Sequence, residues 1–101
     1  TDLIFVLNNF YNSLKLKGVK VYILYPPLME SSILDDYKKV LNKISKFERE
    51  LDIPILCKFE DSIYKDHLFY NQNYHLNKDG RSKYTINIVN IIREKKILYN
   101  F

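Results

Sequence analysis

The sequence predicts an α/β fold in which a short parallel sheet is flanked by helices in three layers, α/β/α. Two short stretches, 19–25 and 53–58, are mostly apolar and rich in β-branched or aromatic residues, which is typical of strands covered on both faces. A long stretch with helical periodicity lies between them. A strand–helix–strand order of this length predicts a parallel pair joined by a right-handed crossover.

The length of 101 residues limits the chain to a single domain, residues 1–101. Both predicted strands have the composition of central strands, yet a sheet of two strands buries little surface. We therefore expect further strands from a missing amino-terminal half or from another chain, so that this is a partial domain. The chain begins with Thr1 rather than methionine, which agrees with that expectation.

The formal net charge is +4, but the charges do not form a basic patch. Between residues 35 and 50, lysines alternate with acidic residues, a pattern of solvated helix faces that argues against a nucleic-acid partner. One cysteine, Cys57, excludes an internal disulfide and a cysteine-based zinc site. The sequence contains no apolar run long enough to span a bilayer and no cleavable leader.

Three helices are expected from periodicity and end signals. The first covers 3–16, starts at a cap from Thr1 or Asp2, and ends at Gly18. The second covers about 31–51 after Ser31 or Ser32 as the cap. The apolar positions that face the core in these two helices are Leu3, Ile4, Leu7, Phe10, Tyr11, Leu14, Ile33, Leu34, Tyr37, Val40, Leu41, Ile44, Phe47 and Leu51.

Prolines and a capping asparagine define the remaining elements. Pro26-Pro27 ends the first strand, because neither proline can donate a ladder hydrogen bond. The connection 59–74 contains one helical turn around 62–65, and 97–101 forms an extended tail. Asn77 caps the third helix, whose buried positions are Tyr84, Ile88, Ile91 and Ile92.

The stretch around His75 is the candidate functional site, because amides and aromatic residues surround this histidine after the second strand. In parallel α/β sheets, sites form beyond the carboxyl ends of the strands. A histidine there has a near-neutral pKa and accepts a proton from a hydroxyl nucleophile when a third group fixes its tautomer. On the sequence pattern alone, we favour a loop residue that bonds to the backbone and helps to cap the third helix.

Two motifs, Tyr74-His75-Leu76-Asn77-x-x-Gly80-Arg81 and Tyr25-Pro26-Pro27-Leu28, resemble the carboxyl-terminal half of SGNH/GDSL-type hydrolases. The resemblance is closest to the hydrolase-like proteins associated with cell-envelope polysaccharide modification. It implies an SGNH/flavodoxin-like fold and a serine esterase or acyltransferase that acts on O-acylated carbohydrate. It also implies His75 as the general base, no metal or organic cofactor, and a location in the cell envelope.

The chain departs from this family at two places. The aspartate that holds the histidine falls on Asn71 or Gln72, and we assign Asn71 to this role. An amide cannot stabilise imidazolium by charge, and this replacement costs roughly four orders of magnitude in serine proteases. The Gly-Asp-Ser block of the nucleophile is absent from the chain, so we expect it upstream and expect the isolated chain to be inactive.

Other interpretations remain open. The chain is alternatively a non-catalytic SGNH-like binding or structural module, or an unrelated α/β interaction module. His67 and His75 could share a metal with Asp61 or Asp66, but their spacing fits no named ligand pattern. Helix capping explains Ser31 and Ser32 better than a nucleophilic role does.

Two residues follow Asn77 in the predicted third helix. Gly80 permits close packing in its first turn, and Arg81 suits a surface salt bridge.

Overall fold

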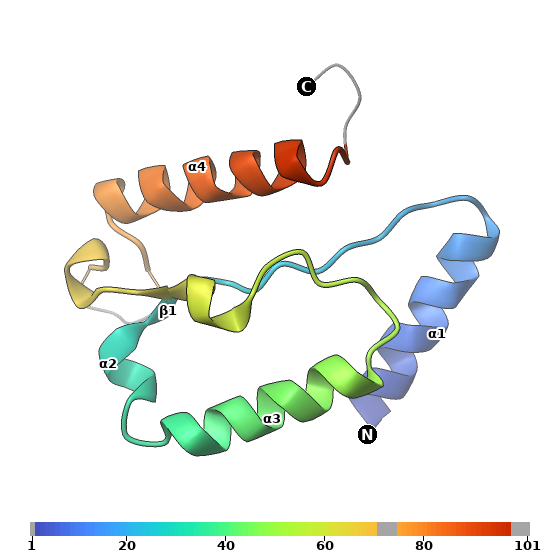
Figure 1. Ribbon diagram of the computed structural model, residues 1–101, viewed down its shortest axis with the longest axis horizontal. Helices are drawn as coiled ribbons and strands as arrows, with labels where there is room; N and C mark the ends of the chain where they lie inside the picture. The colour runs from blue at the N-terminus through green and yellow to red at the C-terminus, as the bar shows by residue number, and fades with distance from the viewer. Residues whose placement is uncertain (1, 71–74, 98–101) are drawn as a thin grey trace. The chain divides into compact units, whose positions relative to one another are not determined.

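The computed structural model describes residues 2–70 and 75–97 (Figure 1). The chain forms two compact units, the first from Thr1–Leu24 and Asp36–Leu56, the second from Tyr25–Asp35 and Cys57–Phe101. The elements in chain order are α1 (Asp2–Leu16), β1 (Leu28–Met29), α2 (Glu30–Ile33), α3 (Tyr37–Glu50), η1 (Phe59–Ser62), β2 (Ile63–Tyr64), η2 (Asp66–Leu68) and α4 (Lys78–Glu94).

The fold is mixed α/β with a short parallel sheet, as the sequence predicts. The two strands of this sheet are β1 and β2, with Leu28 opposite Ile63 and Met29 opposite Tyr64. The predicted strands at 19–25 and 53–58 pair in parallel at one bridge, Ile23 with Ile55. The parallel orientation is therefore confirmed, whereas the predicted strand boundaries are wrong. The chain pairs again at Leu28, directly after Pro26-Pro27.

In the first unit, α1 ends as predicted. Gly18 has φ 78°, a left-handed conformation that is unfavourable for residues other than glycine. Its N–H donates to the carbonyl of Lys15, and the N–H of Val19 donates to the carbonyl of Leu14. Both bonds satisfy carbonyls that the end of a helix leaves without partners. The glycine thus turns the chain sharply from α1 into the extended stretch that follows.

The side chain of Asn8 joins α1 to the end of α3 within the first unit. Its Nδ2 donates to the carbonyl of Glu50 over 2.9 Å, and its Oδ1 accepts from the N–H of Asp52 over 2.7 Å. Asn12 donates to the Asp52 carboxylate over 3.1 Å. The two bonds of Asn8 satisfy backbone groups where α3 ends. Ile4 and Ile53 are buried in the same unit.

The single long helix predicted over 31–51 is wrong, because the chain breaks between α2 and α3. Asp36 has φ −118° and ψ 29°, outside helical geometry, and Leu34 is 58% exposed. The serine cap is also wrong, because Met29 occupies the N-cap of α2 without a side-chain bond. Periodicity cannot reveal this break, since both pieces keep their apolar residues in phase.

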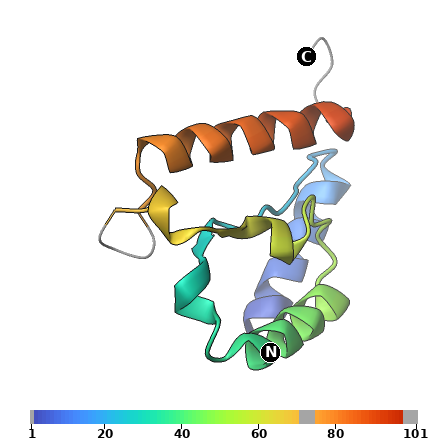
Figure 2. The ribbon, with the colours of Figure 1, turned by 60° about the vertical axis from the view of Figure 1, so that its left-hand side comes forward.

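In the second unit, α4 extends alongside the stretch that contains β2 (Figures 1 and 2). Tyr64, Leu68 and Phe69 form a buried cluster, against which Leu76 and Tyr84 pack. The predicted turn at 62–65 is wrong, because β2 lies there and the 3-10 helices η1 and η2 flank it. The predicted α4 is confirmed, and its apolar positions Tyr84, Ile88, Ile91 and Ile92 are half-buried.

Across the described ranges, no helix combines the length and apolar character needed to cross a bilayer.

Candidate functional site

Asn77 anchors the segment that carries His75 to the start of α4. Its Oδ1 accepts from the N–H of Gly80 over 2.9 Å, so the predicted N-cap is confirmed. Its Nδ2 donates to the carbonyl of His67 over 2.7 Å and approaches the carbonyl of Phe69 at 3.4 Å. One side chain therefore caps the helix and holds it against the chain that follows β2.

Backbone pairing fixes the residues next to His75. The N–H of Asn77 donates to the carbonyl of Leu68, and the N–H of Tyr70 donates to the carbonyl of His75, each over 2.9 Å. Phe69 and Leu76 form an antiparallel bridge. Since successive side chains in extended pairing alternate in direction, Leu76 packs on the core cluster while His75 is exposed.

Gly80 permits the close approach of this segment to the first turn of α4. A Cβ at this position would lie 2.8 Å from Cδ2 of Leu76 and would clash with the carbonyl of Leu68. The backbone carbonyl cannot move away without losing its bond to the N–H of Asn77. The predicted close packing at Gly80 is therefore confirmed.

The carboxyl ends of β1 and β2 are joined by two polar contacts. Lys65 Nζ lies 3.1 Å from Glu30 Oε2, and the N–H of Ser31 donates to Asp66 Oδ1 over 3.1 Å. The Ser31 hydroxyl and N–H hold the pKa of Asp66 below its usual value. These contacts fix the point at which η2 leaves the sheet towards the His75 segment.

The buried Tyr64 and the half-buried Tyr84 belong to the core cluster on which Leu76 packs. Tyr64 is 2% exposed, and its hydroxyl accepts from Nδ2 of Asn87 over 2.9 Å. Burial raises the pKa of Tyr64, an effect that the bond from Asn87 opposes. Burial also raises the pKa of Tyr84. The Lys83 ammonium lies 4.8 Å from the centre of the Tyr64 ring, a cation–π distance.

The structure describes His75, whereas Asn71, assigned to hold it, and the alternative Gln72 lie outside the described residues. His67 is an exposed residue of η2. Asp61, Asp66, His67 and His75 do not gather into a group of three or more metal-ligating side chains within the parts of the chain that are described.

Ser31, Ser32 and Arg81 differ from their predicted roles. Ser31 uses its backbone N–H on Asp66, and the Ser32 hydroxyl donates to the carbonyl of Met29 over 2.7 Å. Neither serine therefore caps α2 by accepting a bond. Arg81 donates from Nη1 to the carbonyl of Leu76 over 3.2 Å and forms no salt bridge within the described ranges. This bond gives the His75 segment a further attachment to α4.

The aromatic residues near the end of the first predicted strand and beside His75 separate into two groups by exposure. Tyr25 and Phe69 are buried, with Tyr25 in an edge-to-face contact with Phe59 at 5.4 Å. Tyr22 and Tyr70 are 37% and 56% exposed. Tyr74 lies outside the described residues.

Sequence reasoning missed the pairs Glu30–Lys65 and Ser31–Asp66. In each pair, the first residue follows β1 and the second follows β2. Both strands contain only two residues, too few for a period-two pattern to be visible. Recognition of Leu28–Met29 as a strand would have placed the residues after β1 and β2 together, because parallel strands share a carboxyl edge.

The chain has no match among models of protein families, and no curated protein or solved structure is significantly similar to it.

Proposed function

We propose that this chain is the carboxyl-terminal part of an SGNH-like esterase or acyltransferase that acts on O-acyl groups of carbohydrate. His75 acts as its general base. In this proposal the short parallel sheet belongs to a larger three-layer α/β/α sheet, which a missing amino-terminal half or another chain completes. The resemblance to SGNH-type hydrolases implies a location in the cell envelope.

The observation that carries the proposal is the way the chain presents His75. The Phe69–Leu76 bridge, the Asn77 cap and the backbone bond from Tyr70 to His75 fix the main chain on both sides of the exposed imidazole. A general base must be held within hydrogen-bond reach of the group that it deprotonates, and rigid attachment of this kind supplies such positioning.

The proposed reaction is acyl transfer through a serine. His75 takes the proton of the serine hydroxyl as the oxygen attacks the ester carbonyl, and returns it to the leaving sugar hydroxyl. Water or an acceptor hydroxyl then attacks the acyl-enzyme with the same histidine as base. Asn71 holds the imidazole by accepting a hydrogen bond. The serine lies in sequence outside these 101 residues.

A second candidate is a binding module that retains this fold without catalysis. The residue assigned to hold the imidazole is Asn71, an amide that cannot supply the negative charge of a triad aspartate. The same exposed His75 segment would then bind carbohydrate by hydrogen bonds without deprotonating a nucleophile.

Determination of the coding sequence upstream of Thr1 tests the catalytic proposal. The expected result is a Gly-Asp-Ser block within one domain's length upstream, predicted to form the strand–turn that carries a nucleophile. A continuous upstream reading frame without a serine in such a context would rule out the enzyme and leave the binding module. The 101-residue chain alone is expected to show no hydrolysis of p-nitrophenyl acetate above a buffer control.

A further inference from the structure

The extended stretch 19–24 of the first unit forms backbone hydrogen bonds to the 53–56 stretch along one edge. Its other edge is exposed. Ile23 donates to the carbonyl of Pro54 over 2.9 Å and accepts from the N–H of Leu56 over 3.0 Å. Backbone groups of successive residues in an extended strand point to alternate sides. Those of Lys20, Tyr22 and Leu24 therefore point away from the 53–56 stretch.

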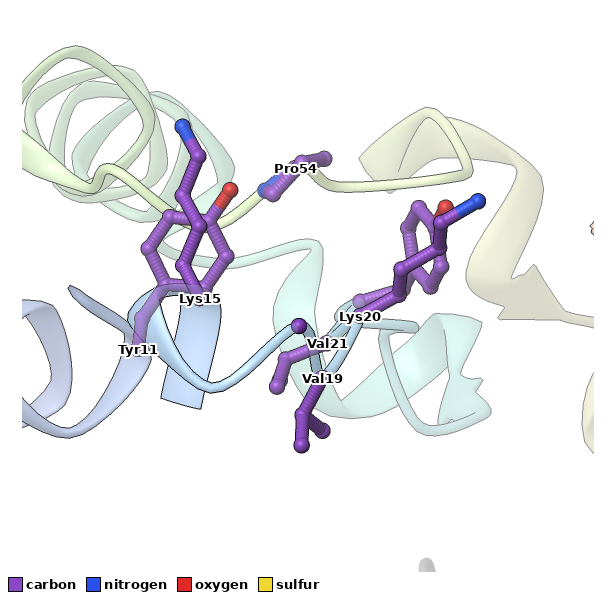
Figure 3. A pocket seen from close by; sticks show the side chains of 8 residues that line it. Tyr11, Lys15, Val19, Lys20, Val21 and Pro54 are labelled. Carbon is purple, nitrogen blue, oxygen red and sulfur yellow. The ribbon is translucent and has the colours of Figure 1, made fainter. Parts of the chain in front are cut away.

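The alternation is visible in the side chains as well. Figure 3 shows Val19 and Val21 projecting to one side of the stretch and Lys20 to the other. Lys20 and Tyr22 are exposed, whereas Val21 and Ile23 are half-buried. None of the backbone N–H and C=O groups of Lys20, Tyr22 and Leu24 takes part in a hydrogen bond to any residue that the structure describes.

We propose that this edge, formed by Lys20, Tyr22 and Leu24, pairs with the same edge of a second copy of the chain in an antiparallel, two-fold symmetric dimer. An exposed strand edge is a template for a further strand. A closed dimer through identical edges requires the two strands to run antiparallel. The proposal rests on this edge and is independent of the role of His75.

Charge selects the antiparallel orientation. Lys15, Lys17 and Lys20 all precede Tyr22 in the sequence. In an antiparallel pair these basic residues lie at opposite ends of the two-stranded ladder. A parallel pair would place them side by side, where like charges destabilise pairing.

The side chains also select one register, centred on Tyr22. Tyr22 then faces Tyr22 of the other copy, an aromatic cross-strand pair, and Lys20 faces Leu24. A register centred on Lys20 would place two lysines opposite each other. A register centred on Leu24 would place Tyr22 opposite Pro26, which has no N–H to donate.

Sedimentation equilibrium of the 101-residue chain tests the dimer. We expect a concentration-dependent monomer–dimer equilibrium, and we expect Tyr22→Lys to raise the dimer Kd about tenfold, because it places two ammonium groups at the two-fold axis. Tyr70→Lys makes the same charge change at a tyrosine that is 56% exposed in the second unit, and should leave the Kd unchanged. A wild-type chain that stays monomeric up to its solubility limit would overturn the proposal, as would equal effects of the two substitutions.

Amide hydrogen exchange of the wild-type chain provides a test that needs no variant. The outward amides of Lys20, Tyr22 and Leu24 should exchange more slowly as the protein concentration rises, whereas the rate at Val21 should not change. Exchange rates at the three outward amides that do not depend on concentration would contradict pairing through this edge.

Discussion

The amide of Asn77 donates a hydrogen bond to the backbone carbonyl of His67 over 2.7 Å, across ten positions of the sequence. The same side chain accepts the N–H of Gly80 at the start of α4. Helix capping and loop attachment thus depend on one residue, and the position of His75 depends on both. Variants of Asn77 that separate these two roles measure what each contributes.

Replacement of Asn77 by alanine should lower the free energy of unfolding by about 2 kcal/mol, because it removes a cap and leaves the His67 carbonyl without its donor. Asn77→Ser keeps a capping oxygen and loses only the bridge, so its loss should be about 1 kcal/mol. Urea unfolding followed by circular dichroism measures both. Equal losses for the two variants would show that the cap contributes nothing, and an unchanged stability of Asn77→Ser would show that the bridge contributes nothing.

Gly80→Ala should destabilise the second unit despite the higher helix propensity of alanine. The added Cβ would lie 2.8 Å from Cδ2 of Leu76 and would press on the Leu68 carbonyl. We expect a net loss of about 2 kcal/mol in the free energy of unfolding. Ser82→Ala, an exposed position in the same helix, is the control and should change stability by less than about 0.5 kcal/mol. An unchanged unfolding midpoint for Gly80→Ala would disprove the close approach.

Asp66 should make the chain sensitive to acid. Its folded pKa lies below the ordinary value of 3.8, because the Ser31 hydroxyl and N–H stabilise the carboxylate. The stabilisation is therefore fully present above 3.8 and is lost as the pH falls through the folded pKa. In thermal unfolding, Asp66→Asn should flatten the decline of Tm at low pH. The control Glu60→Gln removes the charge of an exposed residue of η1 and should leave that decline unchanged.

Tyr64 should have the opposite effect at alkaline pH. Burial raises its folded pKa above the ordinary value of 10.0, although the bond from Asn87 opposes this shift. The contribution of Tyr64 is thus present below 10.0 and lost as the pH rises through the folded pKa. Absorbance titration should show a late transition from Tyr64 and Tyr84, and Tyr64→Phe should reduce its amplitude. A late transition of undiminished amplitude in Tyr64→Phe would contradict the raised pKa of Tyr64.

Local signals in the sequence were sufficient for α1, α4 and their ends. Gly18 and Asn77 act through bonds to residues within five positions, so their effect is visible in a short window of sequence. The parallel orientation was also predictable, because it follows from the order of the elements. The boundaries of α1 and α4 therefore required no knowledge of the tertiary structure.

Contacts between distant residues account for the errors. The start of α2 depends on Asp66, which lies 35 residues from Ser31 in the sequence, and Met29 pairs with Tyr64. No local pattern encodes such pairs. For the candidate site, the predicted cap at Asn77 is confirmed, and the role of His75 stays a prediction. The sequence did not identify the attachment of Asn77 to the His67 carbonyl, because that bond depends on how the chain turns after β2.

The proposed role of His75 is tested most directly by fluorophosphonate labelling of the longer protein that includes the upstream sequence. Such a probe forms a covalent bond with an activated serine hydroxyl. The parent protein should be labelled at one serine, and His75→Ala should slow labelling by about a hundredfold or more. His67→Ala should leave the rate unchanged, because His67 contributes its backbone carbonyl to the bond with Asn77. Labelling of His75→Ala at the parental rate would contradict the assignment of His75 as the base.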